Sequence, residues 1–281
     1  MKIRNWSLYG AVALATTMTF SSCEQTEVDN PAEVSNEVLA ILTNAGFDVE
    51  NQAPITFENG YLVEGDIYIP SEDLASLKEG NQLPNDEHYH TTNLVAVNGS
   101  RNITLYVPEG GNRGYSPVYV AAADEAIARF NAENLTITMS RVTSSSQADI
   151  VFTRLRKGDE RRGVLGSAGF PTSAGDPYGE IKMSGILESS YGLSVNGIAT
   201  IMAHEIGHCI GFRHTDFYDR SISCGGSPSN EGASTVGAEY IPGTPAIGEV
   251  SLAKKSWMLA CADGGDRPFN NNDKVALDYL Y

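Results

Sequence analysis

The segment His204–Asp216 (HEIGHCIGFRHTD) holds three of the five histidines in this chain. His208 follows His204 by four residues, so on a helix both imidazoles project from one face, with their Cβ atoms about 5–6 Å apart. Zinc binds an imidazole nitrogen at about 2.0–2.1 Å, which lets two rings at this spacing reach one ion. The spacing therefore predicts a metal site on a helix.

The residues around this pair predict an open position on the metal. Gly211 can adopt the left-handed conformation that ends a helix, after which His214 can return as a third ligand. Three protein ligands leave one position of a tetrahedral zinc site for water, which is the catalytic arrangement. Glu205 lies beside the first ligand and can take a proton from this water, whose pKa zinc lowers to roughly 7. We expect one catalytic Zn²⁺, held by His204, His208 and His214.

The full pattern HExxHxxGxxH fixes five identities over eleven positions and is far more specific than HExxH alone. The alternative is a solvent-facing helix with incidental histidines. The apolar residues around the pattern argue against that alternative, because an unbonded imidazole in a buried helix is costly. These apolar residues are Ile198, Ala199, Ile201, Met202, Ile206 and Ile210.

A capped apolar helix must carry the pattern, and the sequence places it at Gly197–Phe212, after Ser194-Val195-Asn196. Upstream, strand patterns surround one helical pattern, which is typical of an α/β fold with a helix crossing between strands. The strands are expected at 102–107, 135–141, 149–155 and 180–183, and the helix begins after Ser116-Pro117 and runs through Asn131. A small helix (Val34–Leu42) and a hairpin (Ile55–Ile69, turning at Asn59-Gly60) come first.

The chain has 281 residues and a formal net charge of −16, and residues 1–100 carry fifteen acidic against three basic side chains. An acidic chain without a basic stripe repels phosphate backbones, so nucleic acid is not an expected partner. Lys2 and Arg4 precede an apolar stretch, Trp6–Phe20, which is too short for a membrane span and ends in small residues. Residues 1–22 therefore read as a secretion signal.

Cys23 follows Ser21-Ser22, and this arrangement resembles a bacterial lipobox. The resemblance implies cleavage before Cys23 and a lipid on its sulfur and new amino group, with residues 23–33 as an acidic linker to the membrane. The stretch Glu24–Asp29 resembles the signal that sends lipoproteins of some Gram-negative bacteria to the outer surface. We expect an exported outer-membrane or cell-surface lipoprotein of a bacterium; the alternative is a soluble secreted protein cut near the same place.

The extended histidine pattern resembles that of the metzincin zinc metallopeptidases, and its HEIGH spelling is similar to the bacterial dual-action HEIGH metallopeptidases. Ser256-Trp257-Met258 resembles the metzincin methionine turn, and Phe269–Tyr281 resembles the last helix of matrixin-type catalytic domains. With Ala148–Ile150 and Gly163–Pro171, the resemblance covers about residues 100–281. It implies a twisted mixed sheet with an active-site helix and a C-terminal helix, and Met258 beneath the imidazoles. Ordinary core packing is the alternative for Met258.

By the same resemblance, the strand near Gly179–Ser184 is the sheet edge to which a substrate peptide adds as an antiparallel strand. The polar stretch Ser71–Thr92 reads as an exposed connection, which divides a pro-segment or small accessory domain (34–92) from a catalytic domain (93–281). Tyr61–Ile67 resembles the FxGD stretch of astacin propeptides, with Val63 in place of the Phe. The resemblance implies that Asp66 caps the zinc in a zymogen; the alternative is an ordinary turn with Asp66 in solvent.

Lipidation of Cys23 would leave three cysteines in an oxidising compartment, and one disulfide with one free thiol is the simplest count. Cys209 neighbours a metal ligand, but its side chain turns about 100° from the zinc face. We favour a Cys224–Cys261 disulfide, which joins the inserted stretch Ser223–Ser234 to the segment after the methionine turn.

Asp216 either orients His214 or its neighbours by accepting a hydrogen bond, or forms an ordinary turn. Together these features predict a surface-tethered zinc endopeptidase that hydrolyses protein or peptide substrates without a covalent intermediate, with Asp66 as a latency candidate. A non-catalytic metzincin-fold binding protein or adhesin is the alternative, and the intact Glu205 with its three histidines argues against it. The sequence indicates neither an oligomeric state nor a preferred side chain at the cleaved bond.

Overall fold

The computed structural model describes residues 33–50, 52–77, 88–111, 113–232, 237–245 and 255–281. The chain divides into two compact units, Met1–Asn30 and Pro31–Tyr281, and every described residue belongs to the second. The expected signal segment, Cys23 and the linker up to residue 32 lie outside the described residues. Within the described part of the chain, no helix combines the length and apolar character needed to cross a membrane.

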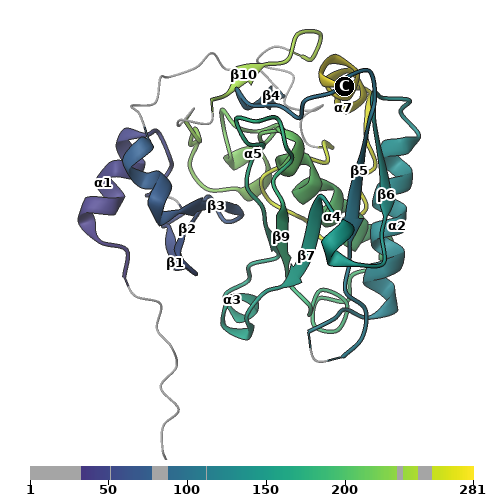
Figure 1. Cartoon of the computed structure of the whole chain (residues 1–281). Coiled ribbons are helices and arrows are strands. Elements are labelled where there is room, and N and C mark those ends of the chain that lie inside the picture. The colour runs from purple at the N-terminus through teal and green to yellow at the C-terminus, as the bar shows by residue number, and fades with distance from the viewer. Residues whose placement is uncertain (1–32, 51, 78–87, 112, 233–236, 246–254) are drawn as a thin grey trace, which may run out of the picture. The chain divides into compact units, whose positions relative to one another are not determined.

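A five-stranded mixed sheet lies at the centre of the fold (Figure 1). Its strands are β5 (Arg101–Tyr106), β6 (Ile137–Arg141), β7 (Ile150–Arg154), β8 (Gly166–Ser167) and β9 (Glu180–Met183), in the order β6-β5-β7-β9-β8. The first four in this order are parallel to one another, and β8 runs antiparallel to β9. Alternate side chains point into the core, as the period of a strand requires. The buried ones include Ile103, Leu105, Ile150, Phe152, Ile181 and Met183.

Two long helices, α2 (Pro117–Asn131) and α4 (Val195–Ile210), pack against each other and against these buried strand residues. Pro117 sits at the start of α2, where its missing N–H costs no helical hydrogen bond. The buried side chains of α2 recur at helical spacing. They are Tyr119, Ala122, Ala123, Ala126, Ile127 and Phe130. The predicted α/β class, with its mixed sheet and active-site helix, is confirmed.

The front segment forms a helix and a small sheet of its own. Helix α1 (Asn36–Asn44) is capped by the Ser35 side chain, and the antiparallel strands β1 (Ile55–Phe57), β2 (Gly60–Val63) and β3 (Ile67–Pro70) precede a 3₁₀ helix, η1 (Ser71–Ser76). The predicted hairpin, Ile55–Ile69, therefore contains three strands instead of two, because a second turn separates β2 from β3. A separate apolar cluster holds the segment together, comprising Leu42, Ala45, Phe47, Val63, Ile67, Ile69 and Leu74.

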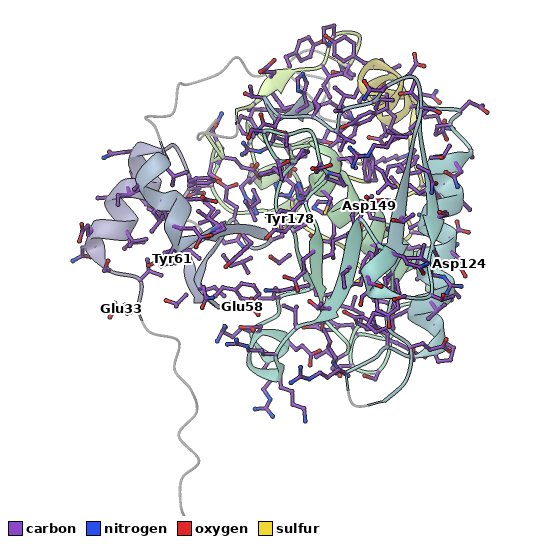
Figure 2. All side chains as sticks on the ribbon, in the orientation of Figure 1. Glu33, Glu58, Tyr61, Asp124, Asp149 and Tyr178 are labelled. Atoms are coloured by element: carbon purple, nitrogen blue, oxygen red, sulfur yellow. A yellow bond between two sulfur atoms is a disulfide. The ribbon has the colours of Figure 1, made fainter. Side chains whose placement is uncertain are left out.

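Strand β3 attaches this segment to the edge of the main sheet. The Tyr68 amide donates to the Ala168 carbonyl, and the Ala168 amide donates to the Asp66 carbonyl, both at 3.1 Å. The bridge between Ile67 and Ala168 is parallel. The turn between β1 and β2 carries Glu58 (Figure 2), whose carboxylate forms an ion pair with Lys182 of β9.

The edge strand differs from the prediction. Strand β9 lies between β7 and β8, so β8 and the adjoining Ala168 form the edge that β3 contacts. A two-residue strand has no alternating pattern, and only its pairing with β9 defines it.

The predicted exposed connection, Ser71–Thr92, is described at both ends: Ser71–Asp73 are exposed as expected, but residues 88–91 are buried, which contradicts the expectation there. His88, Tyr89, His90 and Thr91 are all buried, and β4 (Tyr89–His90) pairs with β10 (Glu239–Tyr240). The Tyr89 carbonyl accepts from the Arg213 amide at 2.8 Å, and the Thr91 amide donates to the Gly211 carbonyl at 2.8 Å. Long-range backbone pairing buries this polar stretch beside the third histidine. Residues 78–87 lie outside the described part.

The remaining short elements are η2 (Ser145–Gln147), α3 (Lys157–Arg161) and α5 (Ser221–Cys224), and the fold ends in helix α7 (Asn271–Leu280). Asn270 and Asp273 form a capping box at the start of α7. At its other end, the Tyr281 hydroxyl donates to the Ile210 carbonyl and accepts from the Val95 amide. The predicted C-terminal helix is thereby fixed to the last turn of α4.

Candidate metal centre

Helix α4 presents His204 and His208 from a wholly buried position. The Ser194 side chain caps its first turn, and Gly211 ends it with a left-handed φ of 111°, as the sequence predicted. Every residue from Gly197 to Ile210 is buried, so the helix has no solvent face.

The two helical histidines each direct Nδ1 at a main-chain carbonyl. His204 Nδ1 lies 3.1 Å from the Trp257 oxygen, and His208 Nδ1 lies 2.9 Å from the Phe212 oxygen. A carbonyl oxygen can only accept, so both rings carry their proton on Nδ1 and present a lone pair at Nε2. This is the tautomer that binds a metal through Nε2.

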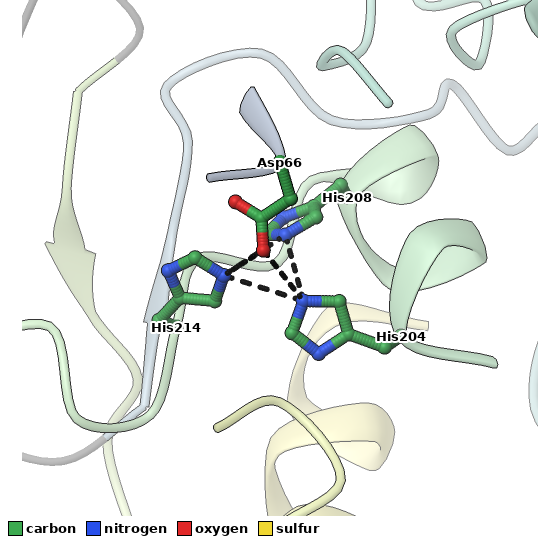
Figure 3. A group of neighbouring side chains, drawn as sticks. All are labelled: Asp66, His204, His208 and His214. Atoms are coloured by element: carbon green, nitrogen blue, oxygen red, sulfur yellow. Dashed lines mark hydrogen bonds and ion pairs between the residues drawn. The ribbon is translucent and has the colours of Figure 1, made fainter. Parts of the chain in front are cut away.

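The three Nε2 atoms converge on one point. His208 Nε2 lies 3.1 Å from that of His204 and 3.2 Å from that of His214, and the His204–His214 separation is 3.2 Å (Figure 3). Burial, followed by the charges of the other two rings, lowers the pKa of His208 well below its usual value. The Nε2 lone pairs of His204 and His208 face one another and repel, so this buried arrangement favours a cation between them.

Asp66 supplies a fourth atom at the same point. Its Oδ2 lies 3.1 Å from His214 Nε2 and 3.5 Å from His204 Nε2, and Figure 3 shows the carboxylate directed at the rings. Burial raises the pKa of Asp66, but the imidazoles outweigh it and hold that pKa well below the usual range. Ligands of a tetrahedral zinc bonded at 2.0–2.1 Å lie about 3.3–3.4 Å apart. The observed separations bracket that value, so the four donors fit a tetrahedral metal ion.

The loop between β2 and β3 fixes Asp66 in this position. Val63 pairs with Ile67, which leaves a three-residue loop in which Glu64 and Gly65 have φ values of 53° and 95°. A glycine adopts such a φ without strain. The Asp66 carbonyl is held by the edge of the main sheet, so the residue is anchored through both its backbone and its side chain.

Met258 is fully buried and packs against α4 at Gly207, the residue before His208. A Cβ at Gly207 would lie 2.5 Å from the Met258 sulfur and 2.6 Å from the Trp257 ring, so only glycine permits this approach. The Met258 carbonyl also accepts from the Thr215 amide at 2.8 Å. Met258 thus contacts the chain both before and after the end of α4, at Gly207 and at Thr215.

Glu205 lies at a cavity of about 210 Å³ between α4, the Asp66 loop and the segment 257–262. The side chain is buried, and its Oε2 has no hydrogen-bond partner among the described residues. Gly166 of β8 packs against it so closely that a Cβ there would lie 2.1 Å from Oε1. Burial, reinforced by the charge of Asp66, raises the pKa of Glu205 well above its usual value. One oxygen of this buried carboxyl group therefore lacks a partner among the described residues.

Comparison with known proteins agrees with this geometry. The family model described as the dual-action HEIGH metallo-peptidase matches residues 61–281, a span that contains all four converging side chains.

The chain belongs to this family.

Among solved structures, two of myroilysin are similar to this chain. One has 15% identity, covers 67% of this chain and 96% of that chain, and gives a TM-score of 0.40. The other has 17% identity, covers 68% and 87%, and gives 0.37. A structure titled "GM1 bound form of the ECX AB5 holotoxin" has 17% identity, covers 55% and 70%, and gives 0.32. A search of curated proteins finds no match.

In this HEIGH metallopeptidase, the third histidine is held by a residue that the sequence did not reveal. His214 Nδ1 lies 2.5 Å from the Glu231 carboxylate, which also accepts from Arg220. Burial lowers the pKa of His214, but Glu231 and Asp66 outweigh it and raise the pKa to about 10. Burial likewise raises the pKa of Glu231, and His214 and Arg220 bring it down to about 2. The available signal was that Glu231 is the only charged residue in the insertion Ser223–Ser234.

Asp216 does not accept from the His214 ring. Its Oδ1 accepts from the Ala260 amide at 2.9 Å and its Oδ2 from the Ser223 hydroxyl at 2.5 Å. A disulfide between Cys224 and Cys261 joins the same two segments, as the sequence favoured. Cys209 is buried and free. Asp216 and the disulfide thus hold the wall of the cavity beside Glu205 rather than the metal ligands themselves.

Proposed function

We propose that this HEIGH metallopeptidase is a zinc endopeptidase made in a latent form, in which its own Asp66 occupies the catalytic position of the metal. One observation carries the proposal. The Nε2 atoms of His204, His208 and His214 lie 3.1–3.2 Å apart, and Asp66 Oδ2 lies against them where a fourth tetrahedral ligand belongs.

The donor set supports zinc over other metals. Three imidazoles and one carboxylate in a compact tetrahedral arrangement suit zinc, whereas magnesium and calcium take six or more oxygen ligands. Two of the three rings are already fixed in the metal-binding tautomer by main-chain carbonyls. Little reorganisation is needed to bind the ion.

A zinc ion held there would polarise the scissile carbonyl and make a water molecule acidic at neutral pH. Glu205 would accept the proton of that water and return it to the leaving amine, because its side chain lines the cavity and its Oε2 has no hydrogen-bond partner among the described residues. The cavity beside it can take a substrate side chain.

The edge of the sheet supports binding of an extended peptide. Ala168, next to β8, exchanges two main-chain hydrogen bonds with Asp66 and Tyr68, on either side of the first residue of β3. A substrate could use the same groups once that strand is gone, and main-chain pairing would accept many sequences. Strand β3 runs parallel to this edge, opposite to the antiparallel direction that the family resemblance implies for a substrate. It would therefore fill the groove without presenting a cleavable bond in the productive direction.

Latency follows from Asp66 and from the strand after it. The Asp66 carboxylate fills the position that water needs, and the strand that follows it covers the sheet edge at Ala168. Activation requires that the hairpin β2–β3, which carries Asp66, move away from the metal site. A cut between Ser71 and His88 would free it, because His88–Thr91 are built into the scaffold beside Arg213.

Export and tethering through Cys23 belong to the same proposal and rest on the sequence of residues 1–23 alone. Mass spectrometry of the mature N-terminal peptide tests them. A lipid-modified Cys23 is the expected result, and an unmodified N-terminus elsewhere contradicts the tether.

Four variants test the activity against a peptide library. Glu205→Ala should keep about one zinc per chain and lose roughly 10²–10⁴-fold in hydrolysis, whereas His208→Ala should lose both zinc and activity. Asp66→Ala should raise the activity of the uncut chain, because the open position becomes available. Glu72→Ala, an exposed carboxylate in η1 of the same segment, is the control and should change nothing.

Two outcomes would contradict the proposal. If Glu205→Ala hydrolyses the library as fast as wild type, Glu205 is not the general base. Equal activity of uncut wild type and Asp66→Ala would show that the front segment does not inhibit, even if the chain is a peptidase.

A further inference from the structure

The third histidine is held differently from the other two. His204 and His208 donate to neutral main-chain carbonyls, but His214 Nδ1 faces a carboxylate, that of Glu231, at 2.5 Å. Glu231 is fully buried, and it reaches the ring from an insertion seventeen residues further along the chain.

Two arginines fix this carboxylate in place. Arg220 donates to the Glu231 oxygen that His214 contacts, and Arg213 lies 3.6 Å from the other oxygen. The backbone is held as well, since the Glu231 amide donates to the Phe217 carbonyl at 3.0 Å and the Arg220 amide donates to the Ser229 carbonyl at 2.9 Å. These contacts restrict the Glu231 side chain to few rotamers.

Arg220 also reaches the front segment. Its second terminal nitrogen donates to the Gln52 side chain at 2.8 Å and to the Glu64 carbonyl at 2.9 Å, two residues before Asp66. These two contacts would be lost with the hairpin, whereas the contact between Arg220 and Glu231 lies wholly within the remaining chain. The carboxylate that holds His214 is therefore secured in both forms.

We infer that Glu231 is a positioning residue of the metal centre, which orients His214 and makes its Nε2 a stronger donor, and that Arg220 holds Glu231 for this task. The physical reason is that a carboxylate accepting from Nδ1–H pushes electron density onto the ring and keeps its plane fixed. This inference rests on the proposed zinc site. It does not require that the site be catalytically active.

The test compares zinc affinity in Glu231→Gln, Glu231→Asp and wild type, measured by competition with a chelator, together with the visible spectrum of the cobalt-substituted proteins. Glutamine keeps the shape and an acceptor but removes the charge. It should weaken zinc binding by about 10–100-fold and shift the cobalt bands. Aspartate keeps the charge and should recover part of the loss.

Glu239→Gln is the matched control, because it makes the same chemical change at an exposed carboxylate in β10. Its zinc affinity and cobalt spectrum should equal those of wild type. Thermal unfolding of each metal-free variant checks that the fold is intact.

The results separate this inference from the proposed activity. If Glu231→Gln is folded and matches wild type in zinc affinity and cobalt spectrum, Glu231 is only a structural ion-pair partner and the inference is overturned. If the affinities fall in the expected order but no variant, wild type included, hydrolyses any peptide, the inference stands and the proposed peptidase activity fails.

Discussion

The Glu205 carboxylate fits into its site only because the facing residue, Gly166, has no side chain. The Glu205 side chain occupies space that any side chain at position 166 would claim, since a Cβ there would lie 2.1 Å from Oε1 and 2.6 Å from the carboxyl carbon. The glycine in β8 is therefore what leaves room for the Glu205 carboxylate, the proposed general base.

Gly166→Ala should displace the Glu205 carboxylate. In the Asp66→Ala background, kcat should fall by up to the roughly 10²–10⁴-fold that a general base contributes, with zinc content unchanged. The control is Gly179→Ala, where the nearest atom, the Asp149 carbonyl oxygen, would lie at an ordinary 3.6 Å. Wild-type kcat in the Gly166 variant would show that the carboxylate can act from a shifted position.

The site residues that could be predicted from the sequence are those whose relative positions are set by a single helix. His204, Glu205 and His208 share one helix, so their spacing in sequence fixes their spacing in space. Glu231 reaches His214 through the fold of an insertion, and no helical or strand period connects the two. Asp66 was predicted only because residues 61–67 resemble a stretch of astacin propeptides.

At the scale of elements, the long ones were predictable and the short ones were not. Helix α2 ends at Asn131 as predicted, because its start signal and apolar period are local properties of the sequence. The two-residue strands β4 and β8 are defined by partners far along the chain. The two wrong predictions, for the edge strand and for the exposed connection, both concern these short strands.

The disulfide between Cys224 and Cys261 joins two such short elements, α5 and the segment after the methionine turn. Replacing both cysteines by serine should cost about 2–4 kcal/mol of unfolding free energy, because the bridge closes a long loop, with a sequence separation of 37 residues. Chemical denaturation measures this loss. Reductant should destabilise wild type by a similar amount and leave the double variant unchanged; an equal response in both would place the effect elsewhere.

At the scale of the whole molecule, buried polar groups join segments that are distant in sequence. Asp273 of α7 accepts from His88 Nε2 at 2.8 Å and from the Ser256 hydroxyl at 2.6 Å, and its second oxygen accepts from the Asn270 amide. Ser256 in turn accepts from the Met258 amide. One carboxylate thus joins the C-terminal helix, the turn at Ser256–Met258 and the buried segment that begins at His88.

Asp273→Ala should therefore destabilise the fold by about 3–5 kcal/mol, since it removes one partner of a buried pair and a helix cap. Asp278→Ala, at an exposed position on the same helix, should stay within about 0.5 kcal/mol of wild type. Urea unfolding of the two variants checks the difference. Similar losses in both would mean that the network contributes little.

The four-donor geometry around Asp66 also bears on how the protein acquires its metal. A site closed by four protein ligands is exchange-inert compared with one that keeps a water, because no coordination position is available to an incoming competitor. If Asp66 is the fourth ligand, as proposed, the front segment retains the metal ion as well as blocking the site. Each chain could trap its ion while folding, before any hydrolysis is possible, and later exposure of the open site would begin with the metal already in place.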